Sequence, residues 1–431
     1  MTQSNPRRSE LDRRQFLHAS GGALAAVTLA TAGSPIFAHI AGDDIIRVGL
    51  VGCGGRGTGA ATNALTVEPR ARLVALGDLF ADQVDKSYRN LTEDEEVAAQ
   101  VMVDEEHRFS GWDSYLGVID SCDVVIFATT PHFRPMQIEA AVKAGKHIFA
   151  EKPVGVDAMH VERVRKACME ADEKGLTVVS GLCYRYQDAK QQTVERIWNG
   201  AVGDIVSLQC SYNTGGLWHR GRKDEWSEME YEIRNWLYFT WLSGDHITEQ
   251  SIHSLDKIMW VMKDKPPAKC TASGGRIVRT EDKWGNIFDH FNCTFEWDEG
   301  IKLFHSCRQW PGADGNVSDY VFGSRGTAAI QGHRINGENS WRFSGEPNDM
   351  YEAEWIELFK SVKGERPRIN NGEYMCTSTL VSIMGRMSAY TGKTITWKQL
   401  VDSKLDLSPG TYEWGDVSSQ PVAQPGQTPL V

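Results

Sequence analysis

The chain has 431 residues, more than a usual single domain, so two or three domains are expected. Its composition, 41% hydrophobic and 24% charged, is that of a globular protein, and its formal net charge of -11, with no basic stripe, argues against a nucleic-acid partner. The nine cysteines are scattered with no C-x-x-C pair, which favours small buried hydrophobes over disulfides or metal ligands.

The first 42 residues have the pattern of a signal peptide followed by a linker. Residues 12–17 read Asp-Arg-Arg-Gln-Phe-Leu, a twin-arginine pattern, and a weakly apolar run follows at 21–32. That run is shorter than the ~20 residues that a membrane span needs, so no stable membrane anchor is expected. We predict export through the twin-arginine pathway, into the periplasm or beyond. The alternative is a disordered basic tail on a cytoplasmic protein.

A glycine-rich turn follows the first predicted strand, at 48–51. The sequence runs into Gly52-x-Gly54-x-x-Gly57 and then into a small, apolar segment that can begin a helix. Gly52 allows the tight turn, and Gly54 lets the backbone approach a pyrophosphate, which would bind the unpaired N–H groups of the helix N-terminus. We expect this loop to bind the phosphates of a dinucleotide through Gly52, Gly54, Gly55, Arg56 and Gly57.

The next predicted strand, at 72–77, supports this interpretation. It ends at Asp78, 21 residues after Gly57. A carboxylate at about this offset can accept hydrogen bonds from a ribose hydroxyl and repels a 2′-phosphate. The pattern therefore predicts NAD as cofactor, with NADP as the less favoured choice. The alternative is a plain β-α-β unit with a glycine turn.

Strands and helices continue to alternate up to residue 182. The predicted strands end in polar or turn residues that face the ligand crevice of a parallel sheet, first Thr129, Thr130 and Pro131, then Glu151 and Lys152. The alternation predicts a doubly wound parallel sheet over residues 43–182. Its predicted elements are helices at 81–100, 135–144 and 156–174, and strands at 101–103, 123–128, 147–150 and 177–180.

Beyond residue 182 the pattern changes to sequential strands. Without helices between them, such strands predict an α+β domain, 183–431, with a large and mostly antiparallel sheet. Residues 420–431, rich in proline and glutamine, are predicted to be a mobile tail. The other predicted elements are a helix at 189–199, strands at 205–212, 268–278, 288–297, 301–309 and 320–322, and helices at 350–362 and 373–390.

One predicted helix, 245–262, combines an apolar stripe with a polar row. Asp245, Glu249, His253 and Asp256 follow one another at spacings of four, four and three residues, so they would share a face. Carboxylates beside a histidine in a cleft suit proton transfer, with His253 as general base and Glu249 orienting it. The alternatives are a solvated polar face and a metal site of His246, Glu249 and His253.

The glycine loop, the Glu151-Lys152-Pro153 turn and the acid-x-x-x-His helix resemble the Gfo/Idh/MocA oxidoreductase family over residues 44 to about 409. The resemblance implies a Rossmann domain followed by the α+β domain. It also implies that Lys152 lies over the nicotinamide and contacts the reacting hydroxyl, and that Glu249 and His253 line the same site. Two positions depart from the family pattern. The helix acid is glutamate instead of aspartate, and Pro135 replaces a histidine, with His132 nearby as a cofactor contact.

Substrate contacts are expected from several segments. In relatives, the residues at Tyr184 and Arg185 face the interdomain cleft, and we add Asp245 and His246 from the polar helix. An aromatic segment at 218–241 contains four tryptophans among charged residues. Aromatic faces pack on the C–H faces of sugars, so Trp236 is a candidate for sugar binding. The alternative for this segment is ordinary core or a subunit contact.

These features predict an NAD-dependent oxidoreductase that acts on a hydroxyl carbon of a sugar, cyclitol or glycoside. The second interpretation is a redox-neutral NAD-dependent glycosidase or lyase, and the third is a cofactor-binding protein without catalysis. An antiparallel sheet with helices on one face leaves its other face open. As in relatives, we expect a homo-oligomer formed through that face.

Overall fold

A computed structural model describes residues 44–431. The twin-arginine pattern and the predicted signal peptide lie outside the described residues. Among residues 44–431 no helix is both long and apolar enough to cross a membrane.

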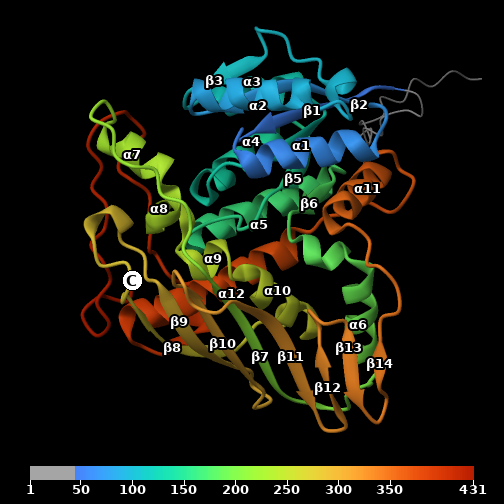
Figure 1. The fold of residues 1–431 in the computed structure, drawn as a ribbon, viewed down its shortest axis with the longest axis vertical. Helices are drawn as coiled ribbons and strands as arrows, with labels where there is room; N and C mark the ends of the chain where they lie inside the picture. Colours follow the sequence, from blue (N-terminus) through green and yellow to red (C-terminus); the bar gives the residue numbers. More distant parts are fainter. Residues whose placement is uncertain (1–43) are drawn as a thin grey trace, which may run out of the picture. The chain divides into compact units, whose positions relative to one another are not determined.

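The first domain is built on a six-stranded parallel sheet with the strand order β3-β2-β1-β4-β5-β6 (Figure 1). Strands β4 and β5 are buried at every residue, as expected for parallel strands covered on both faces. The predicted doubly wound parallel sheet is therefore confirmed. Its strands are β1 (Ile46–Val51), β2 (Ala71–Asp78), β3 (Arg108–Ser110), β4 (Val124–Phe127), β5 (His147–Ala150) and β6 (Val178–Ser180).

Two predicted elements of this domain differ in the structure. The predicted strand at 101–103 is wrong: Val101 makes only an isolated bridge to Leu73, and the edge strand is β3. Val103 is buried and Val101 packs against the core, but Met102 is 55% exposed and the run forms no ladder of paired residues with β2. The predicted helix at 81–100 ends at Glu93 and is followed by a short 3-10 turn at 98–100.

Helices cover both faces of this sheet, and one of them comes from the far end of the chain. One face packs on α3 (Ser114–Ser121), α4 (Arg134–Lys143) and α5 (Ala158–Glu173). The other packs on α1 (Gly55–Val67), α2 (Ala81–Glu93) and α11 (Met350–Val362). Figure 1 shows α11 beside α1, although nearly 300 residues separate them.

The second domain contains a nine-stranded sheet with the strand order β14-β13-β12-β11-β7-β10-β9-β8-β15. All neighbouring pairs are antiparallel except β10 and β7, so the predicted mostly antiparallel sheet is confirmed. The sequence patterns missed the short strands β12 to β15. The strands are β7 (Ile205–Thr214), β8 (Lys269–Gly275), β9 (His290–Glu296), β10 (Lys302–Gln309), β11 (Asn316–Gly323), β12 (Gly326–Ala329), β13 (Arg334–Gly337), β14 (Trp341–Arg342) and β15 (Ile395–Thr396).

Helix α12 (Gly372–Thr391) joins the two domains. It packs on α5 of the first domain and on β8 and β9 of the second sheet, and nearly all its residues are buried. The remaining helices of the second domain are α6 (Asp188–Trp198), α7 (Glu228–Arg234), α8 (Thr240–Ser243), α9 (His246–Glu249), α10 (Ile252–Val261) and α13 (Trp397–Val401).

Residues 402–431, here called the C-terminal segment, have no helix or strand but are docked on the protein. The side chain of Asn286 donates to the Gln420 carbonyl at 2.7 Å, and the Gly426 N–H donates to the Thr391 carbonyl at 2.9 Å. Val422 and Leu430 pack against the core. These contacts show that the prediction of a mobile tail at 420–431 is wrong. The docking could not be predicted, because such backbone contacts leave no periodic pattern in the sequence.

Candidate functional site

The glycine loop forms a cradle at the end of β1. Gly52 has a φ of 97°, a left-handed conformation that favours glycine. A Cβ at Gly57 would lie 1.9 Å from the Gly52 carbonyl oxygen, so the helix can pack this closely only with glycine. A Cβ at Gly54 or Gly55 would instead meet nothing within 4 Å. The space before the N-terminus of α1 is therefore open to an anionic group.

Asp78 fastens the end of β2 to this loop. Its Oδ2 accepts the Cys53 N–H at 2.7 Å and its Oδ1 accepts the Phe80 N–H at 3.0 Å. Burial raises the pKa of Asp78 to about 6, although these backbone N–H groups counteract it. The carboxyl is therefore largely ionised at neutral pH and lines the same cavity as the glycines.

The glycine cradle and the Asp78 carboxyl group line one cavity of about 540 Å³ between the two domains. Lys152, Glu249 and His253 line the same cavity. Trp218, Arg220 and Arg234, from the aromatic segment expected to bind a sugar, also line the cavity. Sequence reasoning missed four further lining residues, Phe80, Gln83, Phe133 and Tyr351. Phe80 and Gln83 follow Asp78 closely in sequence, and this closeness could have identified them as residues of the cavity wall.

Lys152 reaches from the end of β5 to the second domain. Its Nζ donates to the Glu249 carbonyl oxygen at 2.7 Å and lies 3.6 Å from Glu249 Oε1. No hydrogen bond in the described part of the chain joins the Glu249 carboxylate to His253. The expected orienting role of Glu249 toward His253 is therefore not what this geometry shows, because Glu249 contacts Lys152 instead.

His253 is a partly buried, neutral imidazole on the cavity wall. Burial lowers the pKa of His253 well below its ordinary 6.5, and the positive charges of Lys152, Lys257 and Arg56 lower it further. Its Nδ1 has no hydrogen-bond partner within the described residues. The ring packs edge-on against Tyr184, with 5.2 Å between centroids. A neutral imidazole at the cavity wall can accept a proton.

A chain of charges, in which Glu151 and Glu354 are buried and Arg56 is exposed, supports the other side of the Lys152 turn. Arg56 Nε donates to Glu151 Oε1 at 2.6 Å, and its guanidinium lies 3.9 Å from Glu354 Oε1. Glu354, which sequence reasoning missed, is fully buried on α11, and burial raises its pKa well above its ordinary value. Arg56 and Glu151, both predicted to contact the cofactor, thus contact each other as well as lining the cavity.

The predicted helix 245–262 is broken, which separates its polar row. Helix α9 ends at Glu249 and α10 begins at Ile252. Asp245 has a φ of 68° and is fully buried, where it accepts hydrogen bonds from the Phe288 N–H and the Tyr390 hydroxyl. The prediction of one shared face is wrong, because only Glu249 and His253 line the cavity.

Several residues predicted to contact substrate do not line this cavity. Arg185 forms hydrogen-bonded ion pairs with Asp256 and Asp264 beneath the Tyr374 ring. Tyr184 packs on His253 but does not line the cavity. His246, like Asp245, is buried away from it.

Trp236 does line the cavity, together with Trp218 and Arg220. Trp241, from the same aromatic segment, is buried and donates its Nε1 hydrogen to Glu232. The aromatic segment therefore divides into cavity wall and core.

The turn after β4 also contributes some residues to the cavity wall and others to the buried interior behind it. Thr129 and Thr130 line the cavity, whereas Pro131 and His132 are buried behind it. His132 is bonded to the Tyr412 hydroxyl at 2.8 Å, and burial lowers its pKa to about 3. Arg134 lines the cavity and donates to the carbonyls of Thr129 and Pro153, which joins this turn to the Lys152 turn.

The residues present fit a dinucleotide along this cavity. The open glycine cradle at a helix N-terminus fits a pyrophosphate, and Asp78 fits a ribose. Lys152, Glu249 and His253 line the same cavity, where the reactive end of a dinucleotide and its substrate can meet.

Comparison with known proteins agrees with this assignment. Residues 46–182 match the family model described as "Oxidoreductase family, NAD-binding Rossmann fold". The chain is 27% identical to 2,7-anhydro-N-acetylneuraminate hydratase of Escherichia coli K12 over 226 residues, covering 52% of this chain and 55% of that protein. It is 28% identical to D-glucoside 3-dehydrogenase of the same organism over 255 residues, covering 56% and 67%. The chain thus spans about half the length of the first of these relatives.

Among solved structures, aldose-aldose oxidoreductase from Caulobacter crescentus matches with a TM-score of 0.63 and 17% identity. The match covers 82% of this chain and 99% of that one. At this identity the likeness establishes the fold of both domains together.

Proposed function

We propose that the protein is an NAD-dependent oxidoreductase of the Gfo/Idh/MocA family acting on a hydroxyl carbon of a sugar, cyclitol or glycoside, a proposal supported by the match of residues 46–182 to the NAD-binding family model. The observation that carries the proposal is one shared cavity. The glycine cradle and Asp78 line it together with Lys152, Glu249 and His253.

The chain's own residues supply binding, orientation and proton transfer. When bound, the nicotinamide supplies the hydride acceptor. The Lys152 ammonium, fixed by the Glu249 carbonyl, is placed to bind the substrate hydroxyl oxygen. His253, kept neutral by burial and by nearby cations, is placed to accept the hydroxyl proton. The exposed faces of Trp218 and Trp236 offer a platform for a sugar ring.

The test is turnover of a panel of free sugars, cyclitols and glycosides with NAD or NADP, followed by the absorbance of the reduced cofactor. Net reduction, with NAD bound more tightly than NADP because of Asp78, is the expected result. Failure of the purified protein to bind either dinucleotide would refute the proposal.

A redox-neutral reaction is the second candidate. One relative is named a hydratase, a reaction without net oxidation. In such a reaction, transient oxidation acidifies a neighbouring C–H bond, elimination follows, and the hydride returns. Cleavage or dehydration of a glycoside without net formation of reduced cofactor would favour this candidate. The complete Glu151-Lys152-Pro153 turn favours the dehydrogenase. Cofactor binding with neither activity would favour a non-catalytic protein.

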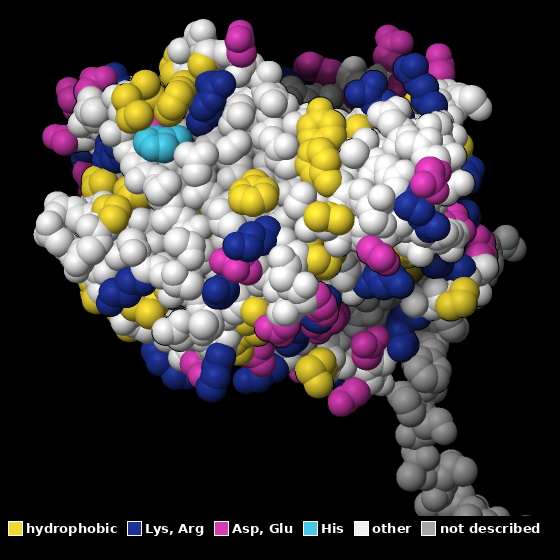
Figure 2. All heavy atoms as spheres, turned by 90° about the horizontal axis from the view of Figure 1, so that it is seen from below, with side chains coloured by type: hydrophobic (Ala, Val, Ile, Leu, Met, Phe, Trp, Pro, Cys, Tyr) yellow, Lys and Arg dark blue, Asp and Glu magenta, His cyan; other side chains and the backbone are white. Residues whose placement is uncertain are grey.

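We also propose that the chain assembles as a homo-oligomer through the open face of the nine-stranded sheet. Figure 2 views the protein from the side on which this sheet lies in Figure 1, and hydrophobic side chains there lie among charged ones. On the strands, Val206 is 60% and Phe304 is 51% exposed. Light scattering at micromolar concentration tests the proposal, and a monomer would contradict it.

Export is proposed from the twin-arginine pattern at 12–17. Replacing Arg13 and Arg14 by lysine should leave the protein in the cytoplasm, as followed by cell fractionation. Unchanged distribution of that variant would contradict export by this route.

A further inference from the structure

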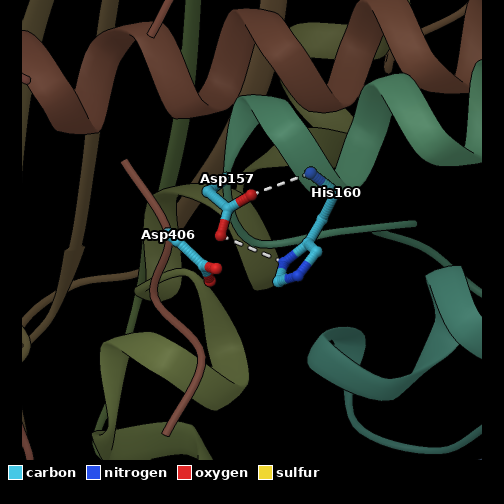
Figure 3. A group of neighbouring side chains, drawn as sticks. All are labelled: Asp157, His160 and Asp406. Carbon is cyan, nitrogen blue, oxygen red and sulfur yellow. Dashed lines mark hydrogen bonds and ion pairs between the residues drawn. The ribbon is translucent and has the colours of Figure 1, made fainter. Parts of the chain in front are cut away.

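Three metal-ligating side chains converge where the C-terminal segment crosses the start of α5 (Figure 3). We propose that Asp157, His160 and Asp406 form a divalent-cation site that fastens the C-terminal segment to α5. One ligand atom from each of the three residues lies within 4.8 Å of the others. None of the three lines the cavity described above, so this site is separate from the proposed active site.

His160 supplies the observation that points to a ligand. The residue is only 7% exposed, and its Nδ1 lies 3.0 Å from Asp157 Oδ2. Despite this closeness, Nδ1 has no partner with hydrogen-bond geometry in the described structure. Figure 3 shows the edge of the imidazole turned toward the carboxylates. An imidazole nitrogen and a carboxylate oxygen that face each other at 3.0 Å are placed to coordinate one cation together.

The Asp157 carboxylate is already oriented by the backbone. It is 1% exposed, its Oδ1 accepts the His160 N–H at 2.8 Å, and its Oδ2 accepts the Leu407 N–H at 3.1 Å. An ionised carboxylate has about four acceptor positions, so two backbone bonds leave room for a cation.

Asp406 completes the set from the opposite side. Its side chain is solvent-exposed, and its Oδ1 accepts the Ser408 N–H at 2.8 Å. It thereby gives the ion a path from solvent. Because Leu407 also bonds to Asp157, residues 406–408 are held against the start of α5 before any ion binds.

The donor set selects the class of cation. Two carboxylate oxygens and one imidazole nitrogen make three protein ligands, which leaves a fourth tetrahedral position for water. This set suits Zn²⁺ or a similar transition metal. It does not suit Ca²⁺ or Mg²⁺, which take at least about six mostly oxygen ligands.

The test is titration of the full chain, free of affinity tags, with Zn²⁺ by calorimetry and with Co²⁺ by visible absorption. We expect one equivalent of cation to bind and to raise the melting temperature by mass action. Asp406→Asn and His160→Ala should each weaken binding by about tenfold or more, at least the effect of losing an outer-shell partner. None of these readouts depends on enzymatic activity.

A matched control lies elsewhere in the first domain. Asp104 and His107 have the same spacing as Asp157 and His160, and their side chains are hydrogen-bonded at 2.6 Å on the surface. His107→Ala should leave cation binding unchanged.

Absence of bound cation, or binding that Asp406→Asn does not weaken, or binding that His107→Ala abolishes, would overturn the proposal. If His160→Ala fails to fold, Asp406→Asn decides, because it changes an exposed carboxylate only.

Discussion

Lys152 extends from β5 to α9, where its Nζ donates to the Glu249 carbonyl at 2.7 Å. Its ammonium group is hydrogen-bonded to the second domain and not to the glycine loop, so we expect its charge to contribute to the reaction more than to dinucleotide binding. Lys152→Ala should therefore lower turnover by roughly 10²-fold or more while the dissociation constant for NAD changes little. Steady-state rates and calorimetric titration with NAD measure the two effects.

Lys166→Ala is the matched control, because that side chain is 73% exposed and distant from the cavity. Near-normal turnover of Lys152→Ala on a proven substrate would place the active site elsewhere. The likeness to the family would then concern the fold alone.

His253 gives a prediction about pH. A general base works only when it is unprotonated, and burial together with nearby cations lowers the pKa of His253 well below 6.5. The rate should therefore remain high below pH ~6.5, where an ordinary histidine already loses activity by protonation. His253→Ala should lower the rate by roughly 10²–10⁴. A full rate for His253→Ala across the pH profile would exclude it as the base.

Within the glycine loop, substitution of one glycine should affect the stability of the fold, and substitution of another should affect dinucleotide binding. A Cβ at Gly57 meets backbone at 1.9 Å, whereas a Cβ at Gly54 meets nothing within 4 Å. Gly57→Ala should thus destabilise the protein. Gly54→Ala should fold normally but weaken NAD binding by about tenfold, or 1.4 kcal/mol, because its methyl group occupies the pyrophosphate's approach. Thermal melts and NAD titration distinguish the two, and equal effects on both variants would contradict this division.

Much of the element pattern could be predicted because alternation of strands and helices follows directly from hydrophobic periodicity. The break between α9 and α10 could not, because it depends on Asp245, whose φ of 68° is held by hydrogen bonds from Phe288 and Tyr390. The contacts of Arg185 could not be predicted for the same reason. Its sequence neighbourhood indicates a cleft residue, but Asp256 and Asp264 reach it only in the folded chain.

Glu232 ties the C-terminal segment to α7 in a pH-dependent manner. The two oxygens of its carboxyl group accept hydrogen bonds from Ser419 Oγ and Trp241 Nε1, both at 2.5 Å, and burial raises its pKa from 4.5 to about 7. The folded chain therefore keeps a proton that the unfolded chain releases. The stability from this group is fully present below pH 4.5 and is lost as the pH rises through 7.

Glu232→Gln removes this titration, so the melting temperature of the variant should fall less than that of the wild type between about pH 5 and pH 8. Glu225→Gln, which changes an exposed side chain, serves as control. Parallel pH profiles for wild type and Glu232→Gln would contradict the assignment.

In the molecule as a whole, the two domains do not correspond to two separate, continuous stretches of the chain. The family match ends at residue 182, yet the core of the first domain includes α11. Trp355 on α11 is fully buried and stacks on Phe149 of β5, with 4.3 Å between ring centroids. Helix periodicity predicted α11 correctly, but its partner could not be predicted, because an apolar stripe does not specify which sheet it covers.

This packing makes the dinucleotide-binding domain depend on residues far outside its sequence boundaries. Trp355→Ala should lower the free energy of unfolding of the whole protein by about 3–5 kcal/mol, since it removes a large buried ring and leaves a cavity against β5. Ile356→Ala changes the next residue of the same helix, which is 38% exposed, and should have little effect. Denaturant unfolding followed by circular dichroism measures both. If residues 44–182 alone folded cooperatively and bound NAD, α11 would be an accessory to that domain and not part of its core.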